Sequence, residues 1–85
     1  MDEIKTGFGR INWIDITKKT GVILQEDDSG VIAKLPFRFQ DIEVGTPATG
    51  QRVQFLIDAT EYSVPVAKHI YVINDLAKRS FQSKM

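Results

Sequence analysis

The feature that most constrains the fold of this chain is a pair of apolar runs separated by a short polar turn. The first run, residues 9–16, contains the only tryptophan, Trp13, and the second covers residues 20–25. The turn at residues 16–19 carries two adjacent lysines. Two short runs rich in β-forming residues and joined by such a turn are typical of a β-hairpin. The sequence therefore predicts strands over residues 5–15 and 20–25.

The first of these strands does not alternate cleanly between apolar and polar residues. The even-numbered positions are Phe8, Arg10, Asn12 and Ile14, and the odd-numbered positions are Gly9, Ile11 and Trp13, so neither set is purely apolar. Because side chains of a regular strand alternate between two faces, a mixed pattern of this kind indicates an extra residue. We therefore expect a β-bulge, and the nearby glycines would also permit a tight bend.

The rest of the chain predicts three more strands, over residues 31–37, 49–58 and 64–73. The cluster Glu26-Asp27-Asp28-Ser29-Gly30 is a strong turn signal. Its spacing does not match a calcium-binding EF-hand loop, so we expect a solvated hairpin tip. Residues 39–42 predict a helical turn and residues 43–48 a polar loop.

The fourth of the five expected strands has the clearest alternation. Its alternation indicates one face in a core. Val53, Phe55 and Ile57 alternate with Arg52, Gln54 and Leu56. After the last strand, an Asn-Asp pair at residues 74–75 predicts the cap of a short helix. We expect one small domain over residues 1–73, followed by a C-terminal helix or tail over residues 74–85.

The amino-acid composition excludes several kinds of chemical site. The chain of 85 residues has no cysteine, which excludes disulfides and cysteine-based zinc or thiol sites. There is one histidine, His69, and no serine has a recognisable base and orienting partner. We therefore expect no enzyme activity, no cofactor and no metal site. With neither a signal segment nor a membrane span, the sequence predicts a cytoplasmic protein without a membrane partner.

Several short motifs resemble those of the cold-shock domain family. The hairpin matches at Trp13, at Lys18 or Lys19, and at Gly21 and Ile23. The run from Leu35 to Ile42 is similar to the family's second motif, and Gly50-Gln51-Arg52-Val53-x-Phe55 to its fourth strand. The Pro65-x-Ala67 approach to the last strand is also similar. The resemblance implies a five-stranded antiparallel OB-type β-barrel, with Leu35, Phe37 and Ile42 in the core.

The same resemblance implies binding of single-stranded RNA or DNA with low sequence preference. Its site residues would be Trp13 and Phe39 for stacking, with Lys18, Lys19 and Arg38 on the phosphates. Arg38 stands where the family has histidine, and Thr20, Val22 and Pro36 replace three of the family's aromatic residues. The formal net charge is zero, which argues against a tight binder dominated by phosphate contacts. Weak, salt-sensitive binding is expected.

Two other interpretations remain open at this stage. If the strand faces follow the family, Val22 and Leu24 point outward, and aliphatic side chains have no π-face on which a base can stack. They favour an OB-type module that has lost nucleic-acid binding and contacts a protein partner or forms a homodimer. An SH3-like small barrel with an unrelated role is also compatible with these patterns.

Overall fold

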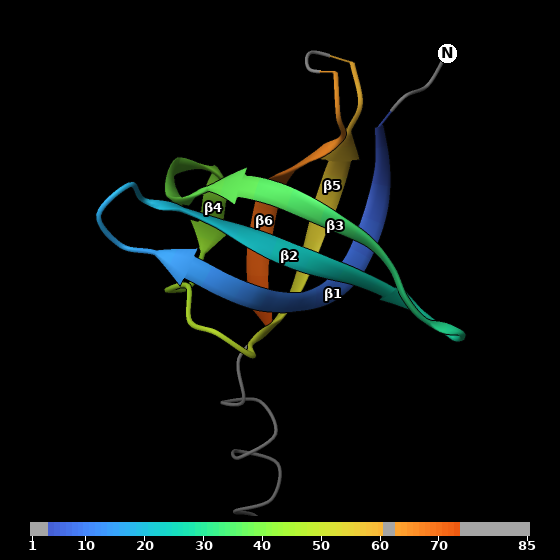
Figure 1. Ribbon diagram of the computed structural model, residues 1–85, viewed down its shortest axis with the longest axis horizontal. Helices are drawn as coiled ribbons and strands as arrows, with labels where there is room; N and C mark the ends of the chain where they lie inside the picture. Colours follow the sequence, from blue (N-terminus) through green and yellow to red (C-terminus); the bar gives the residue numbers. More distant parts are fainter. Residues whose placement is uncertain (1–3, 61–62, 74–85) are drawn as a thin grey trace, which may run out of the picture.

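The chain folds as a single twisted β-sheet without an α-helix in the part described by the computed structural model, residues 4–60 and 63–73 (Figure 1). The strands are β1 (Ile4–Asp15), β2 (Thr20–Asp27), β3 (Gly30–Arg38), β4 (Ile42–Val44), β5 (Arg52–Asp58) and β6 (Val66–Ile73), and a 3₁₀ helix, η1, spans Phe39–Asp41. The strand order in the sheet is β3-β2-β1-β5-β6-β4. No helix in these two ranges is long and apolar enough to span a bilayer.

The predicted β1–β2 hairpin and its bulge are both confirmed. Ile11 lies opposite Ile23, but Trp13 lies opposite Val22, so Asn12 is an extra residue on β1. Because successive side chains alternate between faces, this extra residue leaves Ile11 in the core and turns Trp13 to the outer surface. The bulge is therefore at Asn12 and not at either of the neighbouring glycines.

Gly9 marks the point at which β1 passes from one partner strand to another. It lies opposite Gln25 of β2 and also opposite Val53 of β5. A Cβ atom at this position would come within 1.9 Å of the carbonyl oxygen of Leu24. Only glycine allows the backbones to approach this closely while β1 curves across the sheet (Figure 1).

The core lies between the inner faces of the strands. Its buried members are Ile11, Ile23, Leu35, Phe37, Val53, Phe55, Ala67, Ile70 and Val72. The predicted core positions in the second motif and the fourth expected strand are confirmed, with Ile42 and Ile57 half-buried against this cluster. These side chains hold the outer face in place, and the site is built on that face.

The acidic cluster after β2 is a hairpin tip, as predicted. Asp27 lies opposite Gly30, and its Oδ1 accepts hydrogen bonds from the backbone N–H of Ser29 at 2.8 Å and from the Ser29 hydroxyl at 2.6 Å. These two bonds stabilise the charged form and hold the pKa of Asp27 below its ordinary value. The carboxylate thus closes the turn.

Where the sequence predicts five antiparallel strands, residues 4–60 and 63–73 form six, and one of the strand pairs is parallel. The helical turn is confirmed as η1 over Phe39–Asp41, but Ile42 at its expected end and residues 43–44 of the expected polar loop form β4, which pairs with β6 in parallel. Two β-branched residues around one glutamate are too short a pattern to indicate a strand, and only the tertiary contact with β6 defines it. The expected helix or tail over residues 74–85 lies outside the described residues.

Candidate functional site

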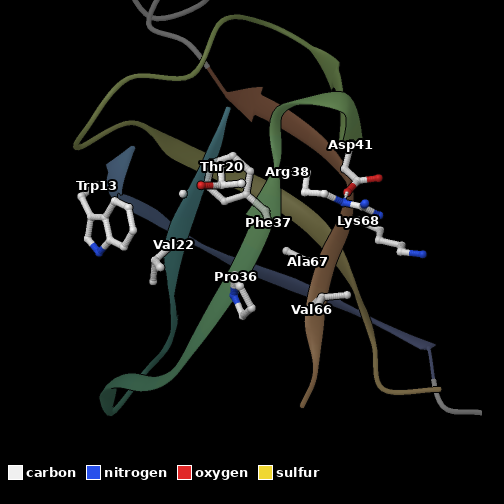
Figure 2. A pocket seen from close by; sticks show the side chains of 11 residues that line it. Trp13, Thr20, Val22, Pro36, Phe37, Arg38, Asp41, Val66, Ala67 and Lys68 are labelled. Atoms are coloured by element: carbon white, nitrogen blue, oxygen red, sulfur yellow. Dashed lines mark ion pairs between the residues drawn. The ribbon is translucent and has the colours of Figure 1, made fainter. Parts of the chain in front are cut away.

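A groove of about 360 Å³ opens on the outer side of the sheet, where β2 and β3 face the first half of β6. It is lined by Trp13, Thr20, Gly21, Val22, Pro36, Phe37, Arg38, Asp41, Val66, Ala67 and Lys68. Figure 2 shows the indole of Trp13 at one end of the groove and the charged side chains of Arg38, Asp41 and Lys68 at the other. The groove therefore has an aromatic end and a charged end, with a mainly apolar floor between them.

The aromatic end is set by strand register. Trp13 pairs with Val22, and Val22 pairs with Pro36, so the three side chains share one outward row across β1, β2 and β3. Trp13 is 47% exposed, Val22 is half-buried and Pro36 is exposed. The indole thus has an accessible surface beside an aliphatic one.

The charged end contains cations with neighbouring carboxylates. Arg38 Nε lies 3.9 Å from Asp41 Oδ2, and Lys68 Nζ lies 3.6 Å from Asp58 Oδ2. Asp58 Oδ1 also accepts hydrogen bonds from the Thr60 hydroxyl at 2.6 Å and its backbone N–H at 2.8 Å. The Thr60 bonds, with a smaller contribution from Lys68, hold the pKa of Asp58 below its ordinary value. This end is therefore polar but close to electrically balanced.

The structure brings three of the sequence-predicted site residues together: Trp13, Val22 and Arg38 all line the groove. Phe39 lies elsewhere. It is half-buried against the core, and its ring stacks on Phe37 with the centroids 6.2 Å apart and 19° between the planes. A ring packed in this way has less surface to offer a base, so a stacking role for Phe39 stays a prediction.

The predicted lysines and Leu24 lie near the groove without lining it. Lys18 and Lys19 are exposed in the β1–β2 turn, where the Lys18 N–H donates to Asp15 Oδ1 at 3.1 Å. The carbonyl of Lys19 accepts from the N–H of Phe39 at 2.9 Å, which fastens this turn to the start of η1. Leu24 is half-buried on the outward side of β2, one row away from Val22. Their proposed contacts stay predictions.

Sequence reasoning missed the contribution of β6. Val66 and Lys68 face the groove because β6 passes beside β3, and no local pattern in the sequence reports that approach. Pro36 and Thr20 were noted only as replacements for aromatic residues, yet both line the groove. Within residues 4–60 and 63–73, no group of three or more His, Cys, Asp or Glu side chains is placed to hold a metal ion.

Comparison with known proteins supports the fold. No protein-family model matches the chain, and no curated protein matches it. Among solved structures, the crystal structure of Ag(I)CusF is similar, with a TM-score of 0.59 and 16% sequence identity. The alignment covers 84% of this chain and 99% of that chain. At this identity the likeness concerns the fold alone, and the Ag(I) belongs to CusF. The chain therefore has an OB-like, all-β fold, and the groove beside Trp13 lies on its outer surface.

Proposed function

We propose that this chain binds single-stranded RNA or DNA with low sequence preference. The observation that carries the proposal is the exposed indole of Trp13 at the end of a groove on the outer face of an OB-like sheet. An exposed aromatic face lets a base of any sequence stack, and each stacked base contributes about 1–3 kcal/mol.

In this arrangement one base stacks on Trp13 and extends over Val22 and Pro36, while the adjoining phosphate reaches Arg38. The Arg38–Asp41 pair is long, at 3.9 Å, and the arginine side chain is 51% exposed. Exposed ion pairs contribute roughly 0–1 kcal/mol, so a phosphate can compete with Asp41 for the guanidinium. The aliphatic floor offers no base-specific hydrogen bonds, which is consistent with low sequence preference.

The finer fold assignment is part of the same proposal. The strands at the two edges of the sheet are β3 and β4, and only η1 separates them along the chain. Because β4 pairs with β6, this one segment contacts strands at both ends of the strand order. We infer that β3, η1 and β4 act as a single interrupted strand of a closed five-stranded barrel. The hairpin, second-motif and fourth-strand matches support assigning this barrel to the cold-shock type.

Titration of Trp13 fluorescence with short oligonucleotides tests the proposal. We expect saturable quenching that weakens as salt is raised, because phosphate contacts release counterions. With a labelled oligonucleotide, Trp13→Ala should weaken binding about 5- to 150-fold, the equivalent of one stacking interaction, and Trp13→Phe should retain much of it. Ile16→Ala, which changes an exposed apolar residue in the β1–β2 turn, is the control. Absence of binding up to about 1 mM oligonucleotide, weaker than ordinary non-specific binding, would refute the proposal.

The apolar floor of the groove favours a second candidate, a homodimer or protein contact through this surface. Val22, Pro36 and Val66 offer no π-face for a base, and a second apolar surface would bury them. This candidate predicts concentration-dependent dimerisation in sedimentation measurements that Val22→Asp abolishes. A monomer at every concentration would exclude the homodimer.

A further inference from the structure

A second set of exposed rings lies on the outer surface, away from the groove. Phe8 of β1 pairs with Gln54 of β5, which pairs with Tyr71 of β6. Directly paired residues project from the same side of a sheet, so Phe8 and Tyr71 stand in one outward row. Phe8 is 53% exposed and Tyr71 is 44% exposed. Both rings thus have accessible faces.

The adjacent outward row is basic. Arg10 of β1 lies opposite Arg52 of β5 on one side and Leu24 of β2 on the other, and Leu24 lies opposite Lys34 of β3. All three cations are exposed. This basic row, defined as Arg52, Arg10 and Lys34, runs across the strands from β5 to β3 and crosses β1 at Arg10, between Phe8 and Trp13. On the outer side of β1, one cation therefore lies between two rings, and the row extends the positive charge onto β5 and β3.

The placement of Arg10 opposite Arg52 does not by itself stabilise the fold. Like charges directly opposite in adjacent strands destabilise the pair. Glu26 offsets part of this, with its Oε2 3.6 Å from Arg10 Nε. Arg52 and Phe8 also line a hollow of about 400 Å³ together with three carboxylates, Glu26, Asp27 and Asp28. The Arg10 side chain remains 53% exposed, and exposed pairs of this kind contribute little. Both arginines are thus exposed, and a phosphate can compete with these carboxylates for them.

The geometry points to an extended nucleic-acid path along the outer side of β1. Phosphates of the strand contact the basic row, one base stacks on Trp13, and further bases stack on Phe8 and Tyr71. This inference rests on the proposed function and names the residues that extend its site. Phe8 and Arg10 are two residues apart, about 7 Å at strand spacing, and the bulge and curvature of β1 keep Phe8 and Trp13 within about 16 Å of each other. Several nucleotides are needed to span that distance, within the roughly 4–16 that OB folds occupy.

The test compares oligothymidines of about three and about eight nucleotides, on either side of the lower limit for an OB fold. Labelled oligonucleotides report binding by anisotropy, and Trp13 quenching reports the groove separately. Arg52→Gln should weaken the longer oligonucleotide about fivefold at 0.1 M salt and reduce its salt slope by about 0.7, which corresponds to one lost phosphate contact on a single strand. Phe8→Leu, which keeps an apolar side chain without a ring, should weaken it about fivefold or more. Binding of the shorter oligonucleotide should change in neither variant.

Matched controls separate this contribution from net charge and from stability. Lys5→Gln removes one positive charge from the other side of β1, away from Phe8 and Arg10. It should leave the binding of both oligonucleotides unchanged. Arg52→Lys should retain most of the salt slope. Each variant is first shown to have the wild-type thermal unfolding midpoint. If Trp13 is quenched but Arg52→Gln and Phe8→Leu leave the longer oligonucleotide unchanged, this inference is overturned while the proposed function stands. If neither oligonucleotide binds, both fail.

Discussion

From the close approach of β1 to β2 at Gly9 we predict how much a side chain at this position lowers the free energy of unfolding. In Gly9→Ala the new Cβ would lie 1.9 Å from the Leu24 carbonyl oxygen and 3.0 Å from the Gln25 Cα. Both contacts are with backbone atoms of a paired strand, so no side chain can move aside. Ordinary van der Waals contact begins near 3.4 Å. The strands must therefore separate by more than 1 Å at the point where β1 is paired on both sides.

That separation has a calculable cost. Opening the ladder loses about two backbone hydrogen bonds, at roughly 1 kcal/mol each. Overpacking of the adjacent core adds about 1–3 kcal/mol. We expect Gly9→Ala to lower the free energy of unfolding by about 3–5 kcal/mol. A domain of this size has a total stability of roughly 4–13 kcal/mol at 0.05–0.15 kcal/mol per residue, so this loss removes from about a quarter of the stability to all of it.

Urea denaturation followed by Trp13 fluorescence and circular dichroism measures this loss. Gly7→Ala is the matched control, because Gly7 lies on the same strand and faces the same side. Its added Cβ would meet the ends of side chains, the Phe55 ring at 2.6 Å and the Ile57 Cδ1 at 3.0 Å. Those side chains can shift, so we expect a loss of only about 1–3 kcal/mol. A Gly9→Ala loss below 1 kcal/mol, or one smaller than that of Gly7→Ala, would refute the reasoning.

Three further predictions concern single residues. The folded-state pKa of Asp58 lies below 3.8, so its carboxylate stabilises the fold above that pH, and this contribution is lost as the pH falls through the folded-state pKa. Thr60→Ala should raise the pKa of Asp58 in an NMR titration and lower stability at pH 7, with a difference from wild type that disappears in acid. Lys19 has a φ of 57°, so Lys19→Gly should stabilise the protein by about 0.5–1 kcal/mol in urea denaturation, and an unchanged or lower stability would contradict strain at this turn. His69 has a φ of 49° in β6, which a β-branched residue adopts only with strain, so His69→Val should lower the free energy of unfolding by about 1–3 kcal/mol. Asparagine tolerates this conformation, so His69→Asn should lose only the 2.9 Å hydrogen bond to Glu43 Oε2. Equal losses of the two variants in thermal unfolding would contradict this account.

The parts of the fold that could be predicted from sequence depend on short-range patterns. The β1–β2 hairpin follows from two apolar runs around a turn, and the core side of β5 from the alternation of Val53 and Phe55. The tip at Asp27 follows from turn chemistry. β4 could not be predicted, because residues 42–44 become a strand only through their pairing with Ile70 and Tyr71. Local propensity carries no information about a partner almost thirty residues away.

The candidate site divides along the same line. Trp13 and Arg38 were identified from the family resemblance, and both line the groove. Phe39 was identified from its place in a motif, but the 3₁₀ turn that begins there directs its ring onto Phe37 and the core. The basic row could not be found, because Arg10, Arg52 and Lys34 come from three strands and meet only through their registers.

The bulge at Asn12 connects the fold to the proposed function. Without an extra residue, strand alternation would place Trp13 on the same side as Ile11, which is buried in the core. The strand would then have to accommodate an indole beside Ile23, and the outer surface would lose its aromatic group. With the bulge, Ile11 and Ile14 still contact the core while Arg10 and Trp13 both face outward. A single inserted residue thus lets one strand contribute Ile11 to the core and both Arg10 and Trp13 to the outer surface at which we propose that single-stranded nucleic acid binds.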